Sequence, residues 1–145
     1  MENGRYTINE LSVITGFTTR TLRNYMKRGV LSGTLENGKW YFEHHHLEDF
    51  YSEPLVKEAV ASKQESYIRQ FLENRYRTEE EGCFIYDMPE SMEQITEVMN
   101  RFTTYMKENS LKRFQFYFYY MEKKQLGRFV FIGNIEILKK VISFF

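Results

Sequence analysis

Basic and hydroxyl side chains are concentrated on one short segment near the amino terminus. Arg20, Arg23 and Lys27 lie three and four positions apart, so a helix places them on one face. Guanidinium groups bind phosphate or a guanine edge, and a threonine side chain can contact a base edge or a thymine methyl group. These residue types at this spacing indicate a helix that enters the DNA major groove, with Thr18 and Thr19 at its amino-terminal end.

The charge around these residues is locally positive although the whole chain is neutral. Between residues 5 and 39, six basic side chains stand against two acidic ones, whereas the full sequence of 145 residues has 20 of each. Because the whole chain creates no net field, any attraction for nucleic acid must come from this local surface. A solvated helix face that binds nothing is the alternative explanation of the same cations.

Two short helices joined by a glycine turn are predicted around the basic segment. Thr7 and Glu10 have the spacing of a capping box, and Gly16 is placed to end the first helix. Thr18 then caps a second helix that runs to Arg28. This order and these lengths are typical of a helix-turn-helix.

A β-hairpin is predicted directly after the second helix. Val30–Leu31 and Lys39–Phe42 are strand-like, and an Asn-Gly pair at positions 37 and 38 favours a type I′ turn between them. A hairpin in this position is called a wing. Its Lys39 and Trp40 would hold the flanking DNA backbone or minor groove.

The segment from Tyr6 to Leu31 contains a series of short motifs in fixed order. They are tyrosine-threonine-isoleucine, threonine-glycine, the core Arg20-Thr-Leu-Arg23, and a glycine followed by two aliphatic residues. In this order they resemble the opening of MerR-type winged helix-turn-helix regulators, over roughly the first 50 residues. The resemblance implies that Arg20 and Arg23 contact DNA and that Leu22 belongs to the core.

Some features depart from the MerR pattern. Asn24 and Met26 stand where many members have tyrosine and glutamate, and the hairpin lacks their proline-x-arginine segment. The hairpin sequence and the run His46–Tyr51 are closer to the related excisionase-type domains. The wing contacts and the operator arrangement therefore stay open. The residues expected to contact DNA are Thr18, Thr19, Arg20, Arg23, Asn24, Lys27, Lys39 and Trp40.

These features predict a transcriptional regulator that binds double-stranded DNA as a homodimer, with the rest of the chain setting the half-site spacing. An excisionase-like architectural factor in recombination is the alternative within nucleic-acid binding. A protein-interaction module without DNA function is the alternative from a different class. A small-molecule effector, of unknown identity, is compatible with each of these functions.

The remainder of the chain is predicted to form a linker helix and a small α/β unit. After a short closing helix that begins near residue 43 or 44, Pro54 starts a helix that extends to about Arg77 in one piece or two. The following order of strand, helix, strand, strand and helix predicts a three-stranded antiparallel or mixed sheet with helices on one face. The fold class is α+β, with domains at residues 1–52, 53–81 and 82–145.

One strand of this unit alternates between two kinds of side chain. The phenylalanines of residues 114–118, together with Tyr120, would face the helices, because alternate residues of a strand point to opposite faces. If the opposite face is open, its half-polar side chains would bind a small molecule or, more readily, a second subunit. This surface comprises Arg113, Gln115, Tyr117, Tyr119 and Met121.

Other residues that often carry chemistry do not combine into a site. The consecutive histidines His44, His45 and His46 point in different directions on a helix, so we predict no metal site. Cys83 lies in an apolar strand and is interpreted as a buried hydrophobe rather than a redox sensor. The sequence contains no glycine-rich phosphate loop, nucleophile elbow or spaced carboxylate pair, so we predict neither catalysis nor a cofactor.

The composition also indicates a compartment. A single cysteine cannot form a disulfide within the chain, which fits a reducing environment. No apolar run approaches the roughly 20 residues of a membrane helix. The first residues lack the apolar segment of a secretory signal. We therefore expect a soluble cytoplasmic protein without a membrane partner.

Overall fold

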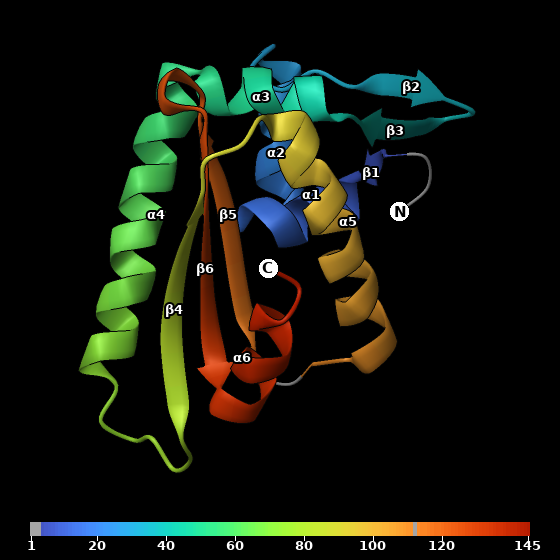
Figure 1. The fold of residues 1–145 in the computed structure, drawn as a ribbon. Helices are drawn as coiled ribbons and strands as arrows, with labels where there is room; N and C mark the ends of the chain where they lie inside the picture. Colours follow the sequence, from blue (N-terminus) through green and yellow to red (C-terminus); the bar gives the residue numbers. More distant parts are fainter. Residues whose placement is uncertain (1–3, 112) are drawn as a thin grey trace.

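The computed structural model describes residues 4–111 and 113–145, and Figure 1 shows its elements. The amino-terminal part comprises β1 (Tyr6–Thr7), α1 (Ile8–Thr15), α2 (Thr19–Lys27), β2 (Thr34–Glu36), β3 (Lys39–Phe42) and α3 (His44–Ser52). After α4 (Pro54–Glu73), the second part comprises β4 (Glu81–Met88), α5 (Met92–Asn109), β5 (Gln115–Met121), a 3₁₀ turn (Glu122–Lys124), β6 (Leu126–Asn134) and α6 (Ile135–Ile142). The α+β class and the helix-turn-helix are confirmed.

Local capping signals set the ends of α1 and α2. The amide of Glu10 donates to Thr7 Oγ1 at 3.2 Å, and the Thr7 amide donates to Glu10 Oε1 at 3.1 Å, as a capping box requires. Gly16 ends α1 at φ +76°, a conformation that favours glycine. Thr18 Oγ1 accepts the amide of Thr21 at 3.1 Å and begins α2. The predicted helix boundaries therefore follow from side chains next to each end.

The hairpin after α2 differs from the prediction in its first strand. The strand β2 is Thr34–Glu36, and Val30–Leu31 is not part of it. The amides of both residues instead donate to the Tyr25 carbonyl, at 2.8 and 3.2 Å, and close the end of α2. The turn has φ of +50° at position 37 and +78° at position 38, as the Asn-Gly signal predicts. A third strand that was not predicted, β1, pairs with β3.

The helix α4 is continuous, which resolves the choice between one helix and two. It begins with Pro54 in its first turn and ends at Glu73, four residues before the predicted end. The Arg77 guanidinium lies beyond the helix and donates to the Phe71 carbonyl at 2.6 Å, so a side chain satisfies one of the last helical acceptors. Among the described residues, no helix has the length and apolarity needed to cross a bilayer.

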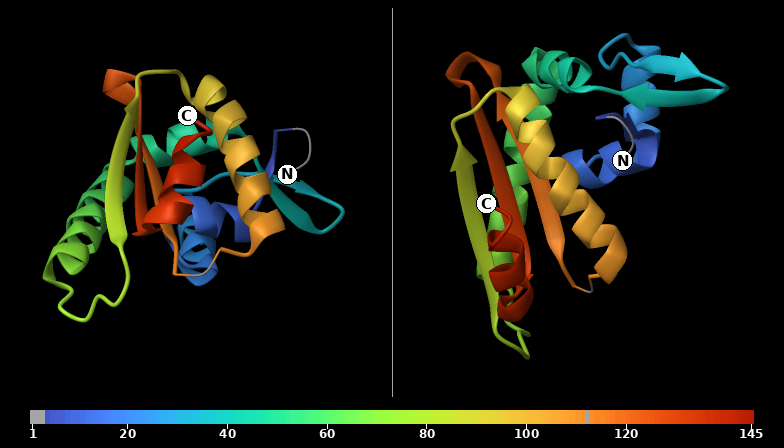
Figure 2. Two further views of the ribbon diagram at one scale, coloured as in Figure 1. Left: turned by 60° about the horizontal axis from the view of Figure 1, so that its bottom comes forward. Right: turned by 45° about the vertical axis from the view of Figure 1, so that its right-hand side comes forward.

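The carboxy-terminal sheet has the order β4-β6-β5, and both pairs are antiparallel. The helices α5 and α6 lie over one face, where Phe102 of α5 packs against Phe116 of β5 with ring centroids 4.7 Å apart (Figure 2). On the other face, Tyr67 of α4 stacks on Tyr117 of β5 at 3.6 Å. The prediction that helices cover one face alone is therefore wrong, because α4 folds back along the sheet.

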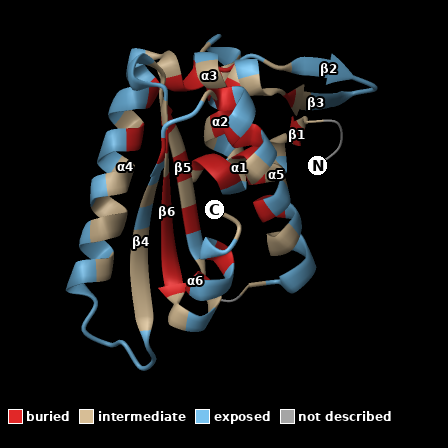
Figure 3. Ribbon diagram, in the orientation of Figure 1, coloured by how far each residue is buried: buried red, intermediate tan, exposed pale blue. Residues whose placement is uncertain are grey.

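The amino-terminal part and the sheet share one buried core (Figure 3). The Tyr51 hydroxyl of α3 donates to the Phe118 carbonyl of β5 at 2.6 Å, and its ring packs edge-on against the Phe118 ring. Tyr6 donates to Asn100 Oδ1 of α5 at 3.1 Å. These buried contacts join segments far apart in the sequence, so the two parts pack as one body.

We expect Tyr51→Phe to lower the free energy of unfolding by about 1–3 kcal/mol, because it leaves the buried Phe118 carbonyl without its donor. Urea unfolding followed by circular dichroism measures the change. The matched control is Tyr76→Phe, since Tyr76 is 90% exposed. Equal midpoints for the two variants would show that the Tyr51 hydrogen bond does not stabilise the junction.

Candidate nucleic-acid interface

The helix α2 has one buried face and one basic face. Leu22 is fully buried and Tyr25 is 8% exposed. The Tyr25 ring packs edge-on against Phe17 and Phe50, with centroids 5.5 and 5.6 Å away. Because this packing directs Leu22 and Tyr25 inward, the helical repeat directs the basic residues outward. The exposed residues of this helix are Arg20, Arg23, Asn24 and Lys27.

The cations of α2 form no ion pair with the acidic side chains that the structure describes. Among the described residues, no ion pair involves Arg20, Arg23 or Lys27. By contrast, Arg5 is held by Glu36 of β2 at 2.7 Å. Of the six basic residues counted in this region of the sequence, Arg5 therefore belongs to a structural pair, whereas the α2 cations face solvent.

A groove of about 480 Å³ lies between α2 and the hairpin. Arg23 and Lys27 line it from the helix, and Trp40 lines it from β3. Lys39 is exposed but points to the opposite face of β3, because neighbouring residues of a strand alternate. The structure therefore brings Arg23, Lys27 and Trp40 together and places Lys39 apart from them.

Thr18 has a structural role at the start of α2. Its hydroxyl oxygen accepts a hydrogen bond from the Thr21 amide, and its hydroxyl proton is donated to Thr21 Oγ1 at 3.0 Å. The helix cap therefore uses the hydroxyl proton and one of the two acceptor positions of Thr18. Thr19, the first helical residue, is partly exposed and has no such bond among the described residues. The two threonines, which sequence reasoning treated alike, therefore have different environments.

Sequence reasoning did not assign five residues of the groove wall, which are Met26, Gly29, Leu31, Ser32 and Gly33. Gly33, the residue directly before β2, was the one signal in the sequence that could have indicated this wall. A Cβ atom on Gly33 would lie 2.7 Å from the Phe42 ring, so only glycine allows the chain to pass the core at this point. Arg28, at the carboxy-terminal cap of α2, is another exposed cation beside the predicted set.

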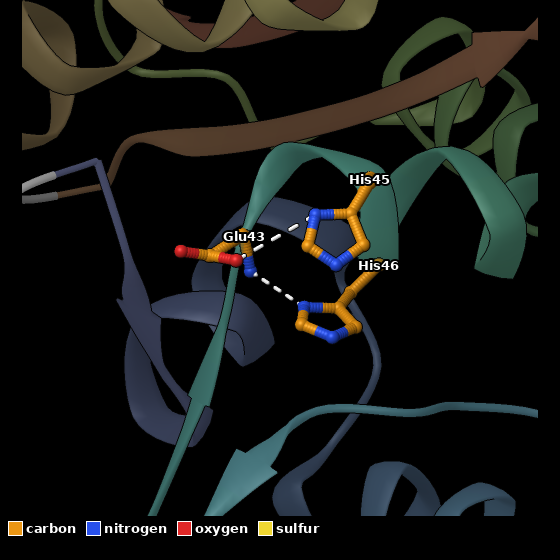
Figure 4. A group of neighbouring side chains, drawn as sticks. All are labelled: Glu43, His45 and His46. Atoms are coloured by element: carbon orange, nitrogen blue, oxygen red, sulfur yellow. Dashed lines mark hydrogen bonds and ion pairs between the residues drawn. The ribbon is translucent and has the colours of Figure 1, made fainter.

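The histidine run begins α3, and His45 and His46 form a cluster with Glu43 (Figure 4). The ring centroids of His45 and His46 lie 4.0 Å apart, so the expectation that consecutive histidines point in different directions is wrong for this pair. His46 Nδ1 accepts the Glu43 amide at 2.9 Å. A neutral His46 ring therefore carries its proton on Nε2 and has no free lone pair for a metal. Glu43 and His45 alone are fewer ligands than the four of a structural zinc site.

The half-polar face of β5 is not an open platform along its whole length. The ring of Tyr67 stacks on the ring of Tyr117. Burial is the main cause that raises the pKa of Tyr117, and the neighbouring Tyr67 raises it further. Arg113, which lies before the first residue of β5, forms an ion pair with Glu79 at 3.4 Å. Gln115 is exposed. The last two members of the predicted surface, Tyr119 and Met121, line a second groove.

Cys83 lies on β4 and is partly buried. Burial raises the pKa of its thiol. A thiol in this state is a poor nucleophile, which favours the packing role over the redox role.

Comparison with known proteins gives a match for the amino-terminal part. Residues 6–52, which extend from β1 to the end of α3, match the family model described as "MerR HTH family regulatory protein". No curated protein and no solved structure matched the chain. The matched residues are the part of the chain that carries the basic face of α2 and the hairpin.

We expect stability to fall as the pH is lowered below the ordinary His46 pKa of 6.5. Burial, and then the neighbouring His45, lower the His46 pKa in the folded state, so the unfolded chain binds the proton first. Protonation removes the acceptor at Nδ1 and costs about 0.5–1 kcal/mol, the lower part of the range for a helix cap. Urea midpoints between pH 8 and 5 measure this loss.

The matched variant is His46→Gln, because glutamine can accept the same amide at this capping position without titrating. Its stability should change less over the same pH range than that of the natural protein. His44→Gln serves as the control, since it removes an imidazole that does not cap the helix. A pH dependence that persists in His46→Gln and disappears in His44→Gln would contradict this assignment.

Proposed function

We propose, from the premise that residues 6–52 form a helix-turn-helix domain of the MerR regulatory type, that this protein is a sequence-specific DNA-binding transcription regulator. The family match points to a DNA-binding regulator rather than an enzyme. The observation that carries the proposal is the basic face of α2. Its cations project together, and none forms an ion pair within the described chain.

In the proposed complex, α2 enters the major groove and its exposed face meets the bases. Arg20, Arg23 and Asn24 are of the types that contact guanine and adenine edges, and Lys27 would contact phosphate. The partly exposed Thr19 would reach a base edge near the amino-terminal end of α2. The packing of Tyr25 on Phe17 supports this complex, because a rigid helix loses little freedom when it binds.

The hairpin would act as a wing on the flanking DNA. It extends away from the body of the protein, and its tip residues are exposed (Figures 1 and 3). Trp40 shares a groove with Arg23 and Lys27, so one DNA backbone strand could lie between the helix and the hairpin. Lys39, on the other face of β3, would contact a separate phosphate. In this arrangement, Lys39 and Trp40 contact different parts of the DNA backbone rather than the same part.

We further propose that two copies pair through the outer edge of β4. This eight-residue strand pairs with β6 on one side, and among the described residues no strand pairs with its other side. Ile85 is 46% exposed on it. A twofold axis between Phe84 and Ile85 would place Glu81 opposite Met88, so antiparallel pairing brings no like charges together. Such pairing protects an edge that would otherwise invite aggregation.

The double variant Arg20→Ala with Arg23→Ala should abolish specific DNA binding and leave the fold unchanged. Each arginine that contacts a guanine contributes about 1–3 kcal/mol of discrimination. Sites are first selected from a random DNA pool, and affinity is then measured by mobility shift over a salt series. Lys27→Ala, which removes the proposed phosphate contact, should instead weaken binding across sequences and reduce the salt slope by about 0.9.

The control is Lys139→Ala with Lys140→Ala, which removes two exposed cations from α6 and lies outside the proposed interface. This pair should bind the selected DNA as the natural protein does. Equal losses in both double variants would reject the role of α2. An absence of salt-sensitive binding would favour the interaction module, and bending of a defined site without promoter control would favour the architectural factor.

Ile85→Lys should convert the proposed dimer into a monomer, because each copy would place a buried charge next to the twofold axis. Light scattering of the full chain measures the mass. The DNA sites that this variant selects should lack the inverted repeat found in the sites selected by the natural protein. The control is Val13→Lys, since Val13 is 48% exposed on α1. A natural protein that stays monomeric at all concentrations would refute the pairing and leave the α2 proposal intact.

A further inference from the structure

A second groove lies between α4 and the end of β5 with its 3₁₀ turn, outside the proposed DNA interface. Its volume of about 710 Å³ falls in the range of small-molecule sites, roughly 300–1,000 Å³. One wall is α4, and the opposite wall contains Tyr119 and Met121 of β5. The groove therefore has the size and the two-sided lining of a ligand site.

The interior of this groove is apolar. Val60, Ile68 and Leu72 contribute from α4, at positions that lie on one side of the helix. Leu72 is 74% exposed, which is unusual for a large aliphatic side chain beside a cavity. Such a lining loses contact with water when an acyl chain or an aromatic group occupies it.

One polar side chain in this lining, Gln64, carries a buried atom. The Oε1 atom of Gln64 is buried and has no hydrogen-bond partner among the described residues. Gln64 lines this groove. An unsatisfied buried acceptor is costly, so a rotation of the Gln64 side chain that brings Oε1 to the groove surface would let the N–H or O–H donor of a ligand satisfy it. The groove therefore favours a ligand with an N–H or O–H group beside its apolar body.

The end of the groove near the 3₁₀ turn is positively charged. Lys57 of α4 pairs with Glu122 at 3.5 Å, and Arg69 pairs with Glu65 along the helix. In the described chain, the remaining cations of the rim, Lys123 and Lys124, have no ion pair. Two uncompensated ammonium groups at one end complement an anion.

We propose that this groove binds an anionic amphiphile of the N-acyl amino acid class. The acyl chain would lie along α4 toward Leu72, the amide N–H would donate to Gln64, and the carboxylate would meet Lys123 and Lys124. The eight positions from Gln64 to Leu72 span about 12 Å of helix, which suits a medium-length chain. The proposal concerns binding alone and does not depend on the DNA proposal.

The test uses two commercial compounds that differ at one group. N-dodecanoylglycine has the amide N–H, and N-dodecanoylsarcosine carries a methyl group in its place. Isothermal titration of the full-length protein, below the micelle concentration, should show saturable one-to-one binding of the glycine compound. Its affinity should exceed that of the sarcosine compound by about tenfold, because only the glycine compound satisfies Gln64.

Variants assign the effect to this groove. Gln64→Leu should remove the preference for the glycine compound. Lys123→Gln with Lys124→Gln should weaken both compounds, whereas the matched pair Lys139→Gln with Lys140→Gln on α6 should weaken neither. Leu72→Asp should weaken both compounds, and since Leu72 is exposed the variant should fold.

Several results would overturn the proposal: no saturable binding, equal affinity for the two compounds, or equal losses in both lysine pairs. Co-sedimentation with phosphatidylglycerol vesicles distinguishes a membrane surface from a free amphiphile. Binding to the vesicles without binding to the monomeric compounds would also refute the assignment. Loss of DNA binding in the arginine variant would have no bearing on these titrations.

Discussion

The packing of three aromatic rings, one of which belongs to α2, is the constraint on which the amino-terminal surface depends. Tyr25 lies edge-on to Phe17 and Phe50, and these two rings also contact each other at 5.9 Å. Because the rings come from the turn before α2, from α2 itself and from α3, they hold all three segments in one orientation. The helix then has a single face left for basic residues, and that face must point to solvent.

The same aromatic packing continues into the sheet and determines how the helix-turn-helix is mounted. Tyr51 follows Phe50 in α3, its ring packs against Phe118, and its hydroxyl bonds to the edge of β5. The basic face is therefore carried by a rigid body rather than by a free head on a flexible linker. In the proposed dimer, the distance between two basic faces would follow from the β4 edge and the sheet.

The helix α4 divides the half-polar face of β5 into two environments. Tyr67 stacks on the half-buried ring of Tyr117, whereas Tyr119 and Met121 lie along the wall of a groove. Two strand positions of the same sequence character thus have different roles. The difference arises because α4 contacts the strand at one level and separates from it at the next.

The amino-acid sequence by itself determined the features that depend on neighbouring residues. The capping box of Thr7 with Glu10, the glycine turns and the Asn-Gly hairpin involve atoms within a few positions, so their signals are complete in the sequence. The mistaken strand at Val30–Leu31 shows the limit, because their amides had two possible partners and the end of α2 took them. Only the tertiary structure decided that α4 folds back on the sheet and that Trp40 shares a groove with Arg23, since these contacts join segments whose approach depends on packing of the whole core.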